Sequence, residues 1–249
     1  MPSDTSSTTD PEFTAYTSAF AVEALQRVAL SEHHRLVVRL GATIAVGAQT
    51  AFRAVLTTAL DAGITPVEVK EVVYQAAAYV GSARTGDFLA VTNTELSARG
   101  VALPLPGQST TDPASRSERG LAVQKAIVGG DQVDALYDRA PADTVHFPRF
   151  LSDNCFGDTV ARNGLDLRTR ELLTFAMLVA LGGADAQVRA HVAGNRTVGN
   201  SRRDLVDVLT VLVQDIGYPR TLNGLAVVED AAPATGAEHA DPQHEQEDA

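Results

Sequence analysis

Apolar residues recur at three- and four-residue spacings along most of the chain, which is the period of an amphipathic α-helix. The spacing is clear in FAVEALQRVAL and HHRLVVRLGATIAVG near the start, and in DLRTRELLTFAMLVALGG and SRRDLVDVLTVLVQDIG near the end. The sequence has no convincing alternation of apolar and polar residues, which would indicate a strand. The pattern therefore predicts an all-α protein.

The predicted helices begin and end at residues that favour those positions. Gly63 and Gly81 follow segments with helical spacing and are expected to end helices. Thr65, Pro66 and Glu68 stand in the order of a capping box, with proline at the first helical position. We therefore expect one helix to begin at Pro66 and to end before Gly81.

The sequence contains an internal repeat with an offset of 136 residues. Sliding the chain by this amount aligns many identical pairs without a gap. These pairs include Leu36 with Leu172, Arg53 with Arg189, Gly63 with Gly199, Gly81 with Gly217 and Leu89 with Leu225. A match of this length and order predicts two copies of one helical unit in tandem.

The two copies differ at polar positions, although they share the apolar ones. At the same offset, Glu171 is aligned with Arg35 and His191 with Val55. Core packing explains most shared apolar positions, and helix ends explain the shared glycines. The polar differences therefore place any site of this kind in the second copy.

Two segments outside the helical copies differ from them in amino-acid composition. The segment VALPLPGQSTTDPAS is rich in proline and small polar residues, as linkers are. From Glu229 onward the chain has seven acidic residues and no Lys or Arg, which favours a disordered tail. We expect a disordered N-terminus at 1–16, a degenerate repeat at 17–100, a linker at 101–117, a second repeat at 118–230 and an acidic disordered tail at 231–249.

Charge and cysteine content exclude several classes of function. The net charge is −11, which argues against a nucleic-acid partner. Cys155 is the one cysteine, so an internal disulfide, a CxxC pair and a cysteine-rich zinc site are excluded. The N-terminus has no basic stretch followed by an apolar one, and no apolar run reaches about 18 residues. We expect a cytoplasmic protein without a membrane span.

The segment from FGDTVARNG to YPRTLNG resembles the carboxymuconolactone decarboxylase family, and ERGLAVQKAIVGGDQVDALYDRA resembles the N-terminal helices of its decarboxylases. The resemblance covers residues 117–230 well and 30–98 more weakly. It implies a fold of the alkylhydroperoxidase D type and one of two chemistries. These are decarboxylation of 4-carboxymuconolactone without metal or organic cofactor, and peroxide reduction by a CxxC pair with a nearby Glu and His.

The peroxidase chemistry does not fit this sequence, because the aligned turn GGADA has no cysteine and a dithiol reaction needs two nearby sulfurs. The decarboxylases match better: His191 falls where they have a histidine, and Arg162, Arg168 and the stretch around them match as well. Two positions depart from their pattern. Glu171 stands where they often have serine, and Arg220 interrupts the YPRTLNG segment, so the pocket is expected to take a different acid.

Loss of CO2 from a carboxylated lactone leaves a dienolate-like charge that must be stabilised and then protonated at carbon. Histidine is the residue type that exchanges protons most readily near neutral pH. We therefore predict His191 and Glu171 as catalytic residues. The residues predicted to bind the carboxylated small-molecule substrate are Arg162, Arg168, Arg189, Asn195, Tyr218 and Arg220.

Simpler explanations exist for each of these residues. Glu171 suits the first turn of a helix because of the helix dipole, and arginines are ordinarily solvated. Counting residues from the turn places Glu171 and His191 roughly 9 Å apart along the helix axes, so we expect no direct hydrogen bond between them. His33 and His34 point about 100° apart on a helix and make no metal chelate.

The resemblance also implies a homotrimer, in which the two copies of each chain reproduce the subunits of a hexamer. It leaves the pathway open between aromatic catabolism and specialised metabolism. Two other functions remain open: a non-catalytic helical scaffold or ligand-binding protein, and a peroxide or redox auxiliary that needs no thiol.

Overall fold

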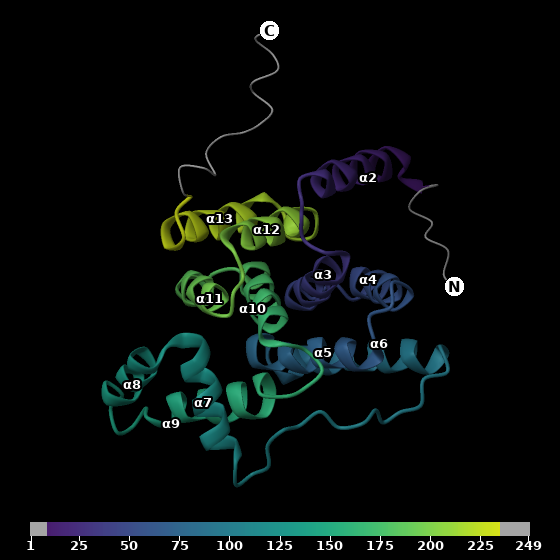
Figure 1. The fold of residues 1–249 in the computed structure, drawn as a ribbon. Helices are drawn as coiled ribbons and strands as arrows, with labels where there is room; N and C mark the ends of the chain where they lie inside the picture. The colour runs from purple at the N-terminus through teal and green to yellow at the C-terminus, as the bar shows by residue number, and fades with distance from the viewer. Residues whose placement is uncertain (1–8, 235–249) are drawn as a thin grey trace.

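The computed structural model describes residues 9–234, and all regular structure in this range is helical (Figure 1). In the first half of the chain the helices are α2 (Pro11–Gln26), α3 (Glu32–Val46), α4 (Gln49–Asp61), α5 (Pro66–Val80) and α6 (Ser82–Ala98). After an extended segment come α7 (Arg116–Val128), α8 (Gly130–Asp138), α9 (His146–Phe150) and the π-helix η1 (Leu151–Val160). The second half ends with α10 (Leu167–Leu181), α11 (Asp185–Thr197), α12 (Arg202–Ile216) and α13 (Tyr218–Ala231). The predicted all-α class is confirmed.

The helices repeat with the offset seen in the sequence. Adding 136 to the bounds of α4 and α5 gives the bounds of α11 and α12, and α3 and α6 match α10 and α13 within a few residues. The same offset places α2 opposite α9 and η1. The predicted tandem repeat is therefore confirmed.

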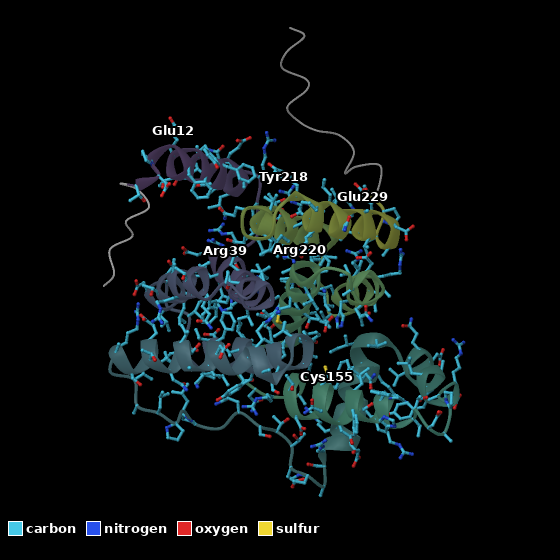
Figure 2. The ribbon with its side chains drawn as sticks, turned by 180° about the vertical axis from the view of Figure 1, so that it is seen from behind. Glu12, Arg39, Cys155, Tyr218, Arg220 and Glu229 are labelled. Carbon is cyan, nitrogen blue, oxygen red and sulfur yellow. The ribbon has the colours of Figure 1, made fainter. Side chains whose placement is uncertain are left out.

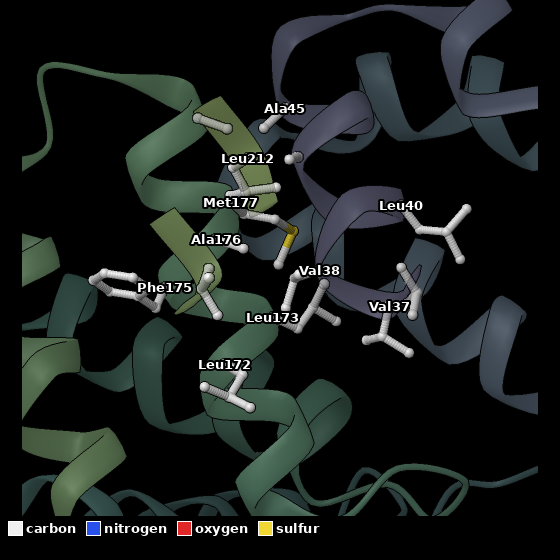
Figure 3. Packing of buried hydrophobic residues seen from close by; sticks show 14 of the residues in the cluster. Val37, Val38, Leu40, Ala45, Leu172, Leu173, Phe175, Ala176, Met177 and Leu212 are labelled. Carbon is white, nitrogen blue, oxygen red and sulfur yellow. The ribbon is translucent and has the colours of Figure 1, made fainter. Parts of the chain in front are cut away.

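The two repeats are packed around the pair α3 and α10, which lie side by side at the centre of the molecule (Figures 1 and 3). Gly41 on α3 allows this close approach, because a Cβ there would overlap the side chain of Leu173 on α10. Leu173, Phe175 and Met177 on α10 are fully buried in the same core. Burial of large apolar side chains is worth about 1.5–3 kcal/mol each, so this interface holds the two repeats together.

Each repeat contacts the other through its first segment. Helix α2 of the first repeat packs on α12 of the second, whereas η1 of the second repeat packs on α5 of the first. Helices α7 and α8 lie between the repeats in sequence, and α7 packs closely along η1. Close packing of α7 and η1 requires Gly120 and Gly157, where a Cβ would overlap the neighbouring backbone.

Local sequence signals placed several helix ends correctly. The Thr65 hydroxyl accepts a hydrogen bond from the amide of Glu68, and the Glu68 carboxylate accepts one from the amide of Thr65. This reciprocal pair is the predicted capping box, with Pro66 in the first turn. Ser201 and Asp204 form the corresponding box at the start of α12.

One boundary was predicted wrongly. Residues 11–16 were expected to belong to a disordered terminus, but they form the first turns of α2, with Pro11 at the helix start. Residues 1–8 and 235–249, which include most of the predicted acidic tail, lie outside the described residues. In the described part of the chain, no helix has the length and apolar character needed to cross a membrane.

Candidate functional site

A cavity of about 490 Å³ opens between the two repeats and the helices that connect them. This volume lies within the range of small-molecule sites, about 300–1,000 Å³. Its wall is formed by Ala78, Tyr79, Gln124, Val128, Leu136, Leu151, Cys155, Phe156, Leu178, Leu181, Ala184, Gln187, Ala190 and His191. None of these residues is Lys, Arg, Asp or Glu, so the described wall is mostly apolar with a few polar groups.

His191 and Glu171 form a hydrogen-bonded pair at this cavity. The distance between His191 Nδ1 and Glu171 Oε2 is 2.8 Å. His191 lines the cavity, whereas the Glu171 side chain is buried behind it with an exposure of 1%. Because a carboxylate accepts hydrogen bonds, Nδ1 carries the proton, and Nε2 of the neutral ring is left unprotonated. Nε2 is then the nitrogen available for proton transfer in the cavity.

The expectation that these two side chains would not meet is wrong, because the turn is shorter than assumed. Helix α10 ends at Leu181 and α11 begins at Asp185. Glu171 is then ten residues from the end of α10, and His191 is six residues from the start of α11. The difference of four residues is one helical turn, roughly 6 Å, which a glutamate side chain can span.

Small and polar residues set the spacing between α10 and α11. Gly194 faces Glu171, and a Cβ at position 194 would lie 2.7 Å from Glu171 Oε2. Asn195 is fully buried, and its Nδ2 donates to the backbone oxygens of Glu171 (3.0 Å) and His191 (2.7 Å). Asn195 was predicted to bind substrate. It instead holds the two helices in register behind the cavity.

Arg162 and Arg168, also predicted to bind substrate, do not line the cavity. Arg162 donates from Nε and Nη2 to both carboxylate oxygens of Glu71, at 2.9–3.0 Å. Arg170 Nη2 donates to the same carboxylate at 2.9 Å, and both Glu71 and Arg170 are 1% exposed. Arg168 Nε donates to Asn200 Oδ1 at 3.2 Å. Each of these arginines has a protein partner, which the residue type alone does not reveal.

The remaining predicted substrate-binding residues lie on other surfaces. Arg189 does not line the cavity and pairs with Asp230. Arg220 packs against the turn at Gly182 and lines a separate small cavity. Tyr218 is 61% exposed. Figure 2 shows Tyr218 and Arg220 on α13, in a different layer of the molecule from Cys155.

The cavity also contains residues that the sequence did not single out as site residues. Tyr79, on α5 of the first repeat, has its ring centroid 6.2 Å from that of His191 in an edge-on arrangement. Burial raises the pKa of the Tyr79 hydroxyl well above its usual value, and the nearby Cys155 and Glu171 add to this. Asp215 takes the place of Tyr79 in the second repeat. This polar difference between the copies is visible in the sequence, but it marks a residue of the first copy.

Cys155, the one cysteine, is buried at the wall of the cavity. It is 9% exposed on η1, and burial raises the pKa of its thiol to about 11. A thiol of this kind is mostly protonated near neutral pH, so it is a poor nucleophile. No cluster of three or more His, Cys, Asp or Glu side chains that could hold a metal ion occurs in the described part of the chain.

The site is therefore shared between the repeats. His191 and Glu171 come from the second repeat, Tyr79 comes from the first, and η1, α7 and α8 close one side. The polar differences between the copies pointed to the second repeat, which supplies His191 and Glu171, and the first repeat contributes Tyr79 to the same cavity.

The fold and the site define a helical two-repeat protein with a histidine–glutamate pair at a cavity between the repeats. A model of the carboxymuconolactone decarboxylase family matches residues 11–94 and again 146–230, and the chain belongs to this family. The second match begins at α9, so α9 and η1 correspond to α2. The chain is also similar to 4-carboxymuconolactone decarboxylase of Acinetobacter baylyi (strain ATCC 33305 / BD413 / ADP1). The two are 26% identical over 115 residues, which is 46% of this chain and 85% of that protein.

Proposed function

We propose that this protein is a cofactor-independent lyase or isomerase that transfers a proton to or from carbon in a small enolisable carbonyl compound. The observation that carries the proposal is the contact between Glu171 and His191, with His191 facing a cavity of ligand size. Family membership and the similarity to a 4-carboxymuconolactone decarboxylase support the same chemistry.

In a decarboxylation, the bond to the carboxylate carbon breaks, CO2 leaves, and its electron pair forms an enolate. Protonated His191 then donates from Nε2 to the carbon and recovers a proton from solvent. In an isomerisation, Nε2 removes a proton from one carbon and returns it to another. In both cases Glu171 stabilises the positive charge on the ring and fixes its orientation, and such general acid–base catalysis contributes about 10²–10⁴-fold to the rate.

The proposal is tested with the full chain, 4-carboxymuconolactone and a panel of uncarboxylated lactones and ketones in D2O. Nuclear magnetic resonance follows both the loss of CO2 and the exchange of deuterium into carbon. The variant His191→Asn keeps a donor that can reach Glu171 but removes the base, and it should lower both rates by at least about 100-fold. His146→Asn, at an exposed position, is the matched control and should leave both rates unchanged. Equal rates in the two variants would refute the proposal.

A second candidate function is the binding of an apolar ligand without catalysis. The specific observation in its favour is the cavity wall, which has no Lys, Arg, Asp or Glu to hold a substrate carboxylate. If this function is correct, the wild-type protein binds members of the panel but neither releases CO2 from them nor exchanges their protons.

We also propose that the protein forms a homotrimer. Phe13 and Tyr16 on α2, and Tyr218 and Leu222 on α13, are more than half exposed, which is typical of surfaces that are covered by another protein chain. Light scattering coupled to size-exclusion chromatography should give three times the mass of the chain. A monomer would contradict the proposal.

A further inference from the structure

Tyr79 lies at the end of a chain of hydrogen bonds that begins at a buried cation. Arg170 Nη1 donates to Gln75 Oε1 at 2.9 Å. Gln75 Nε2 donates to Thr174 Oγ1 at 3.0 Å, and Thr174 Oγ1 donates to the Tyr79 hydroxyl oxygen at 2.9 Å. The chain therefore runs from the guanidinium of Arg170 through two side chains to the cavity wall.

The direction of this chain is fixed by its first two members. A guanidinium has only donors, so the oxygen of the Gln75 amide must face Arg170. The Gln75 nitrogen is then turned toward Thr174 Oγ1 and the backbone oxygen of Arg170, to which it donates at 2.9 Å. Because Thr174 accepts from Gln75, its own hydroxyl proton is directed at Tyr79.

The proton of Tyr79 is left for the cavity. Both hydrogen bonds of Tyr79 among the described residues, from Thr174 and a weak one from Cys155 Sγ at 4.0 Å, use its oxygen as the acceptor. A hydroxyl that accepts a hydrogen bond becomes a stronger donor, because successive hydrogen bonds polarise one another. The raised pKa of Tyr79 keeps this hydroxyl protonated at neutral pH.

We propose that Tyr79 is a catalytic residue of the site and donates its proton in a hydrogen bond to the oxygen of a substrate enolate. This inference rests on the proposed proton transfer by His191. Tyr79 and His191 lie edge to face on one wall of the cavity, so the carbonyl oxygen of a ligand can contact Tyr79 while an adjacent carbon contacts Nε2. Gln75 and Thr174 act through Tyr79 and are positioning residues.

The proposal also defines the substrate class. Negative charge that develops on the substrate oxygen is stabilised by the Tyr79 hydroxyl, whereas the rest of the described wall is apolar or carries uncharged polar groups. The site therefore fits a compact lactone or ketone whose reacting carbonyl is its main polar group. Removal of one such donor from an enzyme site by mutation typically lowers the rate about 10²–10³-fold.

The test uses 4-nitrophenol as an enolate mimic and nitrobenzene as a neutral control of similar shape. The visible absorption of 4-nitrophenolate reports how much of the bound probe is ionised, so the measurement needs no turnover. The wild-type protein should bind 4-nitrophenolate about tenfold more tightly than nitrobenzene. That factor corresponds to one charge-assisted hydrogen bond of about 1.4 kcal/mol.

Three variants separate the alternatives. Tyr79→Phe should abolish the preference for the anion while nitrobenzene binds within about twofold of the wild-type value. Thr174→Val, which breaks the chain, should lower the preference about threefold. Thr210→Val is the matched control, because the one hydrogen bond of its hydroxyl within residues 9–234 goes to the backbone oxygen of Val206 on α12, and it should change nothing.

The proposal fails if the wild-type protein does not bind 4-nitrophenolate, or if Tyr79→Phe still binds it more tightly than nitrobenzene. It also fails if Tyr79→Phe loses affinity equally for both probes while its circular dichroism spectrum shows that it is folded. If His191→Asn removes the preference and Tyr79→Phe does not, a protonated histidine holds the anion and the proposal fails. If Tyr79→Phe removes the preference but His191→Asn retains full exchange activity, the role of Tyr79 stands and the proposed function fails.

Discussion

Arg162, which the sequence assigned to substrate, and its neighbour Arg170 are expected to stabilise the fold through their ion pairs with Glu71. Its carboxylate is 1% exposed and accepts hydrogen bonds from both Arg162 and Arg170. Arg170 is itself 1% exposed, and burial lowers its pKa while Glu71 opposes that effect. Replacing Glu71 by glutamine leaves a buried guanidinium without its counter-ion.

The expected loss of stability follows from this burial. Removing one partner of a buried ion pair destabilises a protein by about 3–5 kcal/mol, because the remaining charge is uncompensated. For a chain of this size, Tm should fall by roughly 6–20 °C. Arg162 is 18% exposed and can reach water, so most of the loss is attributed to Arg170.

Urea unfolding followed by circular dichroism measures the change, with Tm as a second readout. Asp158→Asn is the matched control: it removes the acid of the Arg116–Asp158 pair, which is about one-third exposed on both sides, and it should cost less than about 1 kcal/mol. The double variant Glu71→Leu with Arg170→Met replaces the buried pair by apolar groups and should recover most of the stability. A loss below 1 kcal/mol in Glu71→Gln would refute the reasoning.

Two further predictions concern the cavity. Gly194→Ala places a Cβ 2.7 Å from Glu171 Oε2, so the carboxylate must move and the exchange rate should fall roughly ten- to a hundredfold; an unchanged rate would show that His191 does not need this partner in place. The Cys155 thiol, with a pKa of about 11 against an ordinary 9.0, should react with iodoacetamide about 100-fold more slowly at neutral pH than in the urea-unfolded chain, because only the thiolate reacts. Its rate should rise as pH approaches 11, and mass spectrometry showing equal labelling of folded and unfolded chains would contradict the burial of Cys155.

The elements of the fold were predictable because the signals for them are local. The spacing of apolar residues, the capping box at Thr65 and the glycines at helix ends each depend on a few neighbouring residues. The 136-residue repeat carries these signals from one half of the chain to the other. The bounds of α11 and α12 equal those of α4 and α5 shifted by this offset. The start of α2 was missed because the polar residues before it make its first turns look like part of a frayed terminus.

The site was predictable only in part, because it depends on contacts between distant residues. Family resemblance singled out His191 and Glu171, but their contact depends on where α10 ends, and a difference of two residues in the turn changes the offset by about 3 Å. Arg162 and Arg170 have the residue type of an anion-binding site, yet their partner Glu71 is 91 and 99 residues away in sequence. Composition and spacing do not reveal such a partner.

Comparison of the two repeats explains why the fold contains one such site among the described residues and not two. At the 136-residue offset, His191 corresponds to Val55 and Tyr79 corresponds to Asp215. Asp215 accepts hydrogen bonds from Arg39 Nε at 2.8 Å and Nη2 at 3.1 Å, and Arg39, labelled in Figure 2, takes the place of Phe175. An ion pair thus joins α3 and α12, where the equivalent positions on α10 and α5 carry a phenyl ring and a phenol.

That exchange has a physical consequence for how the site is built. The ion pair satisfies both of its side chains within the protein, so neither is left to meet a ligand. At the cavity, Tyr79 of the first repeat accepts from Thr174 and His191 of the second contacts Glu171, so each presents its remaining polar atom to the cavity. The two equivalent locations therefore differ in whether the protein itself uses all the hydrogen-bonding capacity of their polar groups. At the Arg39–Asp215 pair both side chains bond each other, whereas Tyr79 and His191 each keep a polar atom free for a ligand.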